Sequence, residues 1–182
     1  MKRNFLYSIV LLFFVWSCGS ETPTEEKTAD SEVTHESIEE VDNPEWDDIA
    51  VLSGGFKFSL KVPSESIANS KSLITYHEDS GELELNVGEM YNLIIIEDDF
   101  QMQTVKDEIM NHPFYKVEMI VENDSSLVYR FYTEDASKEA WHIYAERTVD
   151  GSKLIIRSNS EMEFNEYETR KMLESSLSII PF

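Results

Sequence analysis

Two arginines, two tyrosines and a histidine in the second half of the chain are the residues best suited to recognising another molecule. Alternate side chains of a β-strand point to opposite faces, and the strands expected at 127–133, 140–148 and 153–158 place these residues on one face. The five are Arg130, Tyr132, His142, Tyr144 and Arg157. Because arginine and tyrosine are enriched at binding hot spots, the pattern predicts a docking face for a protein or a small anionic ligand.

The alternative is an ordinary solvent-facing surface on which tyrosines and arginines stack across neighbouring strands. On either interpretation the opposite face is expected to be buried. That face carries Tyr129, Phe131, Trp141, Ile143, Ala145 and Ile156. His142 would make binding at the docking face sensitive to pH near neutrality.

The sequence contains no pattern typical of an enzyme nucleophile or a metal centre. There is no Gly-x-Ser-x-Gly turn and no Gly-x-Gly-x-x-Gly phosphate loop. The four histidines do not occur at the spacings of zinc sites. The acidic run 97–99 is expected to cap a helix rather than to bind calcium, which needs more oxygen ligands. We therefore expect no cofactor and no metal.

A hydrolase would require two titratable groups that converge in one pocket. The pair to nominate is His142 with Glu146. Four residues along a strand separate two side chains by about 13 Å, so the two cannot touch directly. An enzymatic function is therefore the least favoured of the alternatives.

Residues 1–17 have the form of a signal peptide. Lys2 and Arg3 precede an apolar run that is shorter than the roughly 20 residues of a membrane-spanning helix. The run ends in Val15-Trp16-Ser17-Cys18, which resembles the lipobox of bacterial lipoproteins. The resemblance implies that Cys18 is acylated and anchors the chain to a membrane. The alternatives are a conventional cleaved secretory signal and an uncleaved anchor.

Cys18 is the only cysteine, so the rest of the chain forms no internal disulfide and offers no thiol for catalysis. Residues 18–43 are rich in Ser, Thr, Asp and Glu, which predicts a disordered acidic tether. The net charge of −21 argues against nucleic acid as a partner. Gly19 stands where enterobacterial lipoproteins of the inner membrane carry aspartate, which implies the outer membrane of the cell envelope, on its periplasmic or surface face.

Residues 44–182 are long enough for a single domain with its own core. Strands are expected at 56–62, 72–77, 82–87, 91–97, 115–121, 127–133, 140–148 and 153–158, and helices at 100–112 and 165–177. The loop at 134–138 and the Asp150-Gly151 turn connect the last three strands. Residues 46–53 are a turn or a short first strand. This order predicts an α+β fold with a mostly antiparallel sheet of about seven to eight strands and two packed helices.

This order of elements resembles the Mog1/PsbP-like group. The opening strand, Phe56–Pro63, ends in Val-Pro, and a helix at 100–112 precedes a long meander. The chain closes with a helix that contains Met172-Leu173-Glu174-Ser175-Ser176-Leu177. Members of the group are mostly adaptors and assembly factors, and the resemblance implies a function of that kind.

These observations predict a membrane-tethered envelope lipoprotein that acts as a non-enzymatic binding or assembly module for an envelope protein partner. The alternative is a carrier of a small or lipidic ligand in a cleft between the sheet and the helices. A deep apolar cavity would favour the carrier, and a solid core would exclude it. A hydrolase is less favoured than either.

Overall fold

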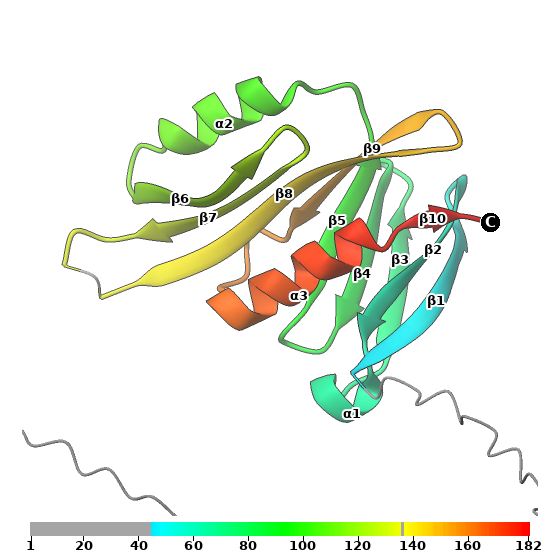
Figure 1. Ribbon diagram of the computed structural model, residues 1–182. Helices are drawn as coiled ribbons and strands as arrows, with labels where there is room; N and C mark the ends of the chain where they lie inside the picture. The colour runs from blue at the N-terminus through cyan, green and yellow to red at the C-terminus, as the bar shows by residue number, and fades with distance from the viewer. Residues whose placement is uncertain (1–44, 136) are drawn as a thin grey trace, which may run out of the picture. The chain divides into compact units, whose positions relative to one another are not determined.

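The computed structural model describes residues 45–135 and 137–182. The predicted signal peptide, Cys18 and the acidic tether lie outside the described residues. In chain order (Figure 1) the elements are β1 Trp46–Ser53, β2 Phe56–Pro63, α1 Glu65–Ala68, β3 Ser72–His77, β4 Glu82–Val87, β5 Asn92–Glu97, α2 Met102–Met110, β6 Lys116–Asn123, β7 Ser126–Tyr132, β8 Glu139–Val149, β9 Ser152–Ser158, α3 Glu166–Leu177 and β10 Ile180–Pro181. Within these ranges no helix is both long enough and apolar enough to cross a membrane.

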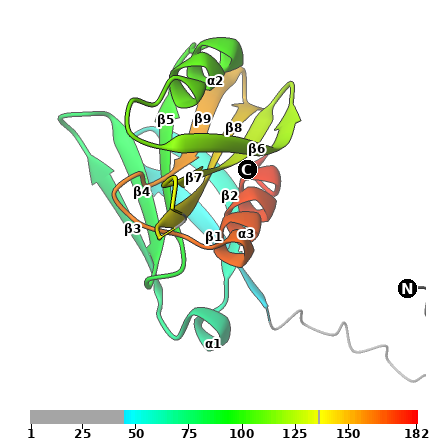
Figure 2. The same cartoon turned by 90° about the vertical axis from the view of Figure 1, so that its left-hand side faces the viewer.

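The strands of the described part form two antiparallel sheets. The large sheet has seven strands in the order β3-β4-β5-β9-β8-β7-β6, and the small sheet has three in the order β1-β2-β10. The small sheet and α3 cover one face of the large sheet, whereas α2 lies over the other face (Figures 1 and 2). The predicted α+β class with a mostly antiparallel sheet is confirmed.

The local patterns that predicted strands hold closely in the structure. In β2 the even-numbered side chains from Phe56 to Val62 are buried, because the strand lies between the core and solvent. In the β3–β4 hairpin Tyr76 pairs with Leu83 and Ile74 pairs with Leu85, as the apolar pattern predicts. Tyr144 pairs with Arg157 across the hairpin that Asp150-Gly151 closes.

Two separate hydrophobic clusters lie on the two faces of the large sheet. Alternate residues of β8 join different clusters: Ile143 belongs to the main core, and Tyr144 belongs to a smaller cluster with Leu127 and Ile155. The main core lies beneath α3 and the small sheet, and it includes Met172 of α3. The apolar side of α2 packs on the smaller cluster. Strand β8 is therefore covered on both faces.

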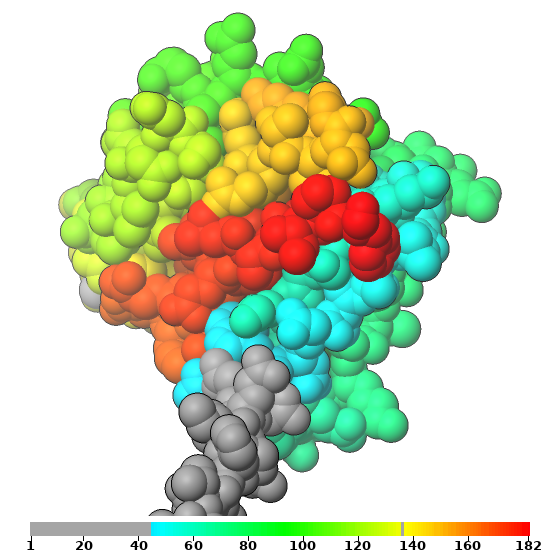
Figure 3. Space-filling view, turned by 45° about the vertical axis from the view of Figure 1, so that its right-hand side comes forward, coloured from blue at the N-terminus to red at the C-terminus, as the bar shows by residue number. Residues whose placement is uncertain are grey.

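Helix α3 is attached tightly to the main core. Asn165 and Glu168 form a capping box at its first turn, which satisfies two backbone N–H groups that the helix leaves free. Its buried side includes Ser175, whose hydroxyl bonds both the Tyr91 hydroxyl and the carbonyl of Lys61. Figure 3 shows α3 filling the space between the β8–β9 hairpin and the small sheet.

The end of the chain differs from the prediction. The apolar sequence of this end predicts that Leu177, Ile180 and Phe182 pack against the sheet, but all three side chains are exposed in the structure. Strand β10 pairs with the edge of β2, with Ile180 opposite the outward-facing Ser59. Because Ser59 faces away from the core, its partner Ile180 does so too, and Ile179 is the buried apolar residue at this end.

Helix α2 is attached much more loosely than α3. It spans Met102–Met110, and none of its residues is fully buried. The expected cap at Asp98 or Asp99 is wrong, since Gln101 occupies the cap position without a side-chain cap hydrogen bond. Helix α2 therefore holds its place mainly through the partly buried Met102, Val105 and Ile109.

The tight turn between β1 and β2 provides a test of the fold. Gly54 and Gly55 both adopt positive φ, of 59° and 90° respectively. A Cβ atom added at Gly54 would overlap the ring of Tyr76, whereas a Cβ atom added at Gly55 would meet no atom within 4 Å. Gly55→Ala should therefore cost about 1 kcal/mol of unfolding free energy, and Gly54→Ala should cost about 1–3 kcal/mol more. Urea denaturation measures both, and equal costs would contradict the packing of Tyr76 on this turn.

Candidate functional site

The structure separates the five residues of the predicted docking face. Arg130 pairs with Trp141, and Tyr129 pairs with His142. Directly opposed residues share a face, so Arg130 and Tyr132 lie on the α3 side of the sheet, whereas His142, Tyr144 and Arg157 lie on the α2 side. The prediction of one shared face is wrong.

The cause is one residue in the loop between β7 and β8. Tyr132 pairs with Glu139, so the loop covers 133–138 and is one residue longer than the 134–138 expected from the sequence. A shift of one residue moves every side chain of a strand to the other face. The Asp135 carboxylate fixes the loop by accepting hydrogen bonds from the Thr133 hydroxyl and from the backbone N–H of Ser137. These bonds, led by that from Thr133, lower the pKa of Asp135 to about 2.

On the α3 side, Arg130 is engaged with its own strand neighbours. Its guanidinium lies 2.6 Å from the Glu118 carboxylate and 3.2 Å from that of Glu139. It also stacks 5.1 Å from the ring centroid of Tyr132 and 5.8 Å from that of Trp141. The cross-strand stacking of arginine on tyrosine that was the alternative is not what occurs here, since Tyr132 lies on the same strand as Arg130 and the ring across the strands is Trp141.

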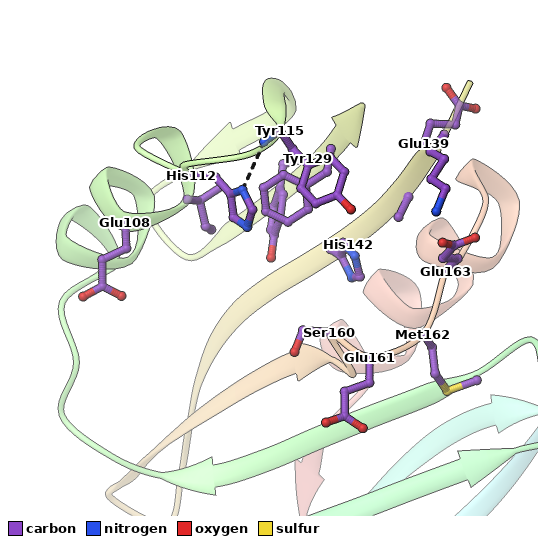
Figure 4. A pocket seen from close by; sticks show the side chains of 14 residues that line it. Glu108, His112, Tyr115, Tyr129, Glu139, His142, Ser160, Glu161, Met162 and Glu163 are labelled. Carbon is purple, nitrogen blue, oxygen red and sulfur yellow. Dashed lines mark hydrogen bonds between the residues drawn. The ribbon is translucent and has the colours of Figure 1, made fainter. Parts of the chain in front are cut away.

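On the α2 side, two adjoining cavities lie between the helix and the sheet. The histidine cavity has a volume of about 440 Å³ and is lined by His112 and His142 (Figure 4). The tyrosine cavity has a volume of about 270 Å³ and is lined by Tyr144 and Arg157. Both cavities share the lining residues Glu108, Ile109, Tyr129 and Ser160. We refer to the two cavities together as the α2 groove.

Aromatic rings line the histidine cavity around Phe131. The ring centroid of Phe131 lies 4.7 Å from that of His112, 5.3 Å from Tyr129 and 5.7 Å from His142. His112 Nδ1 accepts hydrogen bonds from the backbone N–H groups of Phe114 and Tyr115, both at 3.3 Å (Figure 4). The lone pair of Nδ1 is therefore occupied, and Nε2 is the ring nitrogen of His112 that remains for a ligand.

His142 lies deeper in the same cavity and is a neutral imidazole. Its side chain is 3% exposed, and burial lowers its pKa to about 4. Nδ1 lies 3.0 Å from Ser158 Oγ, and that oxygen also accepts a hydrogen bond from the Ile143 N–H. His142 therefore carries no charge at neutral pH, so it gives the groove no pH-sensitive charge near neutrality.

Tyr144, which lines the tyrosine cavity, has a buried hydroxyl group without a hydrogen-bond partner. Tyr144 is 6% exposed, and no described residue forms a hydrogen bond with its hydroxyl. Burial, together with the carboxylates of Glu146 and Asp98, raises the pKa of Tyr144 to about 12. Arg157 lines the same cavity, but its guanidinium is bound to Glu82 at 2.8 Å. Buried hydroxyls are normally hydrogen-bonded, so the unpaired hydroxyl of Tyr144 lowers the stability of the fold at this point.

The acid–base pair nominated from the sequence is separated in the structure. His142 bonds Ser158, whereas the Glu146 carboxylate lies 3.0 Å from Lys153 Nζ, so the pair considered for hydrolysis does not meet. Over 45–135 and 137–182, no group of three or more His, Cys, Asp or Glu side chains could hold a metal ion. The chemistry that this arrangement offers is binding through aromatic rings and the imidazoles of His112 and His142.

Several residues of the α2 groove were not recognised from the sequence. Tyr129 and Phe131 were assigned to the buried face, and His112 was interpreted only as the end of a helix. The alternation along β7 shows that these aromatic residues share one face, but it does not show which face they share with β8.

Comparison of the chain with profiles of protein families, with curated proteins and with solved structures gives no match.

The unpartnered hydroxyl predicts opposite effects for the same substitution at two buried tyrosines. Tyr144→Phe should raise the unfolding free energy of the ligand-free protein by about 1 kcal/mol, because it removes a buried polar group without a partner. Tyr91→Phe should lower it by about 1 kcal/mol, because the Tyr91 hydroxyl is bonded to Ser175. Thermal and urea denaturation measure both changes. A loss of stability in Tyr144→Phe would show that its hydroxyl has a partner.

Proposed function

We propose that this protein is a non-enzymatic binding module, tethered to the cell envelope through Cys18, which holds a small ligand in the α2 groove. The observation that carries the proposal is the pair of adjoining cavities between α2 and the sheet, of about 440 and 270 Å³, which share Tyr129 and Ile109 in their lining. Apolar pockets with a few convergent polar groups are the usual form of small-molecule sites. The carrier hypothesis requires a cleft between the sheet and a helix, and the α2 groove is such a cleft. We therefore favour binding of a small ligand over docking of a protein partner.

The loose packing of α2 supports the same proposal. Val105 and Ile109 turn towards the sheet but remain only partly buried, so the smaller cluster has free volume between helix and sheet. An apolar ligand that filled this volume would remove the exposed apolar surface of Val105 and Ile109 from water. This burial would contribute about 25 cal/mol per Å² to the free energy of binding. Ligand binding would therefore bury the side chains of α2 that remain partly exposed in the protein alone.

The predicted envelope protein partner receives less support. Its docking face required Arg130 and Tyr132 to join His142, Tyr144 and Arg157, and the register of β7 with β8 places the two groups on opposite faces. Arg130 and Arg157 are each bound to a carboxylate of the chain. The hydrolase alternative receives no support, since His142 and Glu146, the pair it required, do not meet.

The location and the anchor rest on the N-terminal sequence. The lipobox-like Val15-Trp16-Ser17-Cys18 supports acylation of the only cysteine, and the acidic residues that follow support a solvated tether. Gly19 supports an outer-membrane location. The proposed relationship to the Mog1/PsbP-like group is supported by an antiparallel sheet with a helix over each face. Members of that group that act as adaptors also bind without catalysis.

Acylation of Cys18 is tested by metabolic labelling. Full-length protein made in cells supplied with radiolabelled palmitate should incorporate label, and Cys18→Ser should lose it completely, because no second thiol is present. The variant should also leave the membrane fraction if the anchor alone retains the protein. Label that is unchanged in Cys18→Ser would overturn the proposed anchor.

Binding in the α2 groove is tested by amide hydrogen exchange. A small-molecule extract of the envelope of the protein's native cells should slow exchange in α2 of the full-length protein by about tenfold or more, since a ligand stabilises the closed helix. Val105→Trp, which fills the tyrosine cavity, should abolish this protection.

Gln103→Trp is the matched control, because Gln103 is exposed and lies on the other side of α2 from Val105. This variant should keep the protection that the extract gives the unmodified protein. The proposed function fails if the extract protects nothing in the unmodified protein. It fails equally if Val105→Trp is protected as well as the control.

A further inference from the structure

Two imidazole rings from different elements line the histidine cavity (Figure 4). His142 comes from β8, and His112 comes from the segment that follows α2. In a neutral imidazole one nitrogen carries a proton and donates, while the other has a lone pair and accepts. The bonds that each ring makes to the chain therefore decide what its other nitrogen offers to a ligand.

The hydrogen bonds of His112 place its ring proton on Nε2. Its Nδ1 accepts hydrogen bonds from the backbone N–H groups of Phe114 and Tyr115, and a nitrogen that accepts carries no proton. Within the described part His112 is bonded through Nδ1 alone. Its Nε2–H group is therefore a donor without a partner.

Ser158 places the ring proton of His142 on Nε2 as well. The Ser158 hydroxyl is buried, accepts a hydrogen bond from the Ile143 N–H and lies 3.0 Å from His142 Nδ1. A buried hydroxyl needs an acceptor for its own proton, and Nδ1 is the acceptor that it meets among the described residues. The hydroxyl therefore donates to Nδ1, and Nε2 of His142 carries the proton.

The Nε2–H group of His142 is open to the cavity. In the described part, the side-chain polar atoms that are closed off from solvent and lack a hydrogen-bond partner belong to Asn92, Tyr144 and Glu146. His142 is bonded through Nδ1 alone, so its Nε2 lacks a partner without being closed off. Since the ring is otherwise buried and lines the histidine cavity, this cavity is the space that Nε2 faces.

These donors favour an uncharged hydrogen-bond acceptor. His142 is neutral, because burial lowers its pKa to about 4, and the Arg157 guanidinium is paired with Glu82. The ammonium group among the lining residues belongs to Lys138, which is exposed. An anion would therefore lose water without meeting a buried opposite charge, and an ammonium ligand would place its donors against those of the rings.

The aromatic lining defines the body of the ligand. The ring centroid of Phe131 lies 5.3 Å from that of Tyr129 and 6.0 Å from that of Tyr115. Such rings pack best against flat apolar groups in offset or edge-to-face contact. The cavity volume of about 440 Å³ is within the range of small-molecule sites.

We infer that the histidine cavity binds a neutral carbonyl compound on an aromatic body, with the carbonyl oxygen accepting a hydrogen bond from the Nε2–H group of His142 and with His112 as a second donor. The inference rests on the proposed function, which requires a ligand in the α2 groove. It adds the chemical class of the ligand and the groups that recognise it.

The tautomers are tested without a ligand. Full-length protein in phosphatidylcholine nanodiscs, with isotope-labelled histidine, should show by NMR at neutral pH a bare Nδ1 and a protonated Nε2 for both rings. His112→Asn and His142→Asn identify the two sets of signals. A proton on Nδ1 of His142 would overturn the inference, because Nε2 would then accept instead of donating.

Three probes of similar shape test the ligand class. Acetophenone carries the carbonyl, α-methylstyrene replaces its oxygen with a methylene group, and benzoate adds a negative charge. Met162 lines the cavity, so its methyl NMR signal reports binding. Acetophenone should shift this signal in a saturable manner, and the other two should bind about fivefold more weakly, as expected for one hydrogen bond. Nanodiscs without protein correct for probe taken up by lipid.

His142→Asn tests the donor itself. Asparagine retains a polar group near the position of Nδ1 for Ser158 but has no atom at the position of Nε2. The variant should weaken acetophenone by about fivefold and leave α-methylstyrene unchanged. His77→Asn is the control, because His77 does not line the groove, and it should alter neither affinity. Equal changes for both probes in His142→Asn would overturn the inference, because the ring would then act through packing alone.

The outcomes separate this inference from the proposed function. If α-methylstyrene or benzoate binds as tightly as acetophenone, the groove does not select a neutral carbonyl, and only the inference falls. If no probe shifts Met162 while the envelope extract still protects α2, the inference again falls alone. If neither probes nor extract have an effect, the proposed function falls with it.

Discussion

The pairing of β7 with β8 determines which side chains face the α2 groove and which face α3. Tyr132 opposite Glu139 is the pair nearest the loop, and every pair further along the two strands follows from it. The hydrogen bonds that Asp135 accepts within the loop hold this end of the ladder. Because the pairing brings Tyr129 and Phe131 beside His142, the aromatic wall of the groove depends on a few bonds in an exposed loop.

The large elements of the fold could be predicted because their signals are local. Alternation in Phe56–Val62 identifies a half-buried strand, and Asp150-Gly151 fixes the β8–β9 register, since a turn with positive φ at both positions, here 51° and 87°, favours such residues. The pairing of the β3–β4 hairpin could be predicted in the same way. The chain end could not be predicted, because whether Ile180 is buried depends on where β10 joins β2, which no local pattern encodes.

Less of the candidate site than of the fold could be predicted from the sequence. His142, Tyr144 and Arg157 were placed correctly relative to one another, because one two-residue turn relates their strands. Arg130 and Tyr132 were placed on the wrong side, because the longer loop before β8 allows two registers that differ by one residue. His112 reaches the groove through the end of a helix far away in the sequence, and such a contact can be seen only once the chain is folded.

The division of the apolar residues into two clusters has a consequence for how this protein can change over time. The main core, with α3 and the small sheet, is closed and tightly bonded, whereas α2 and its cluster contribute no fully buried helical residue. Under the proposed function, substitutions beneath α2 would therefore alter ligand binding while leaving the main core intact. A lineage could retune the pocket repeatedly on an unaltered scaffold, so relatives of this chain could share its architecture and differ in what they carry.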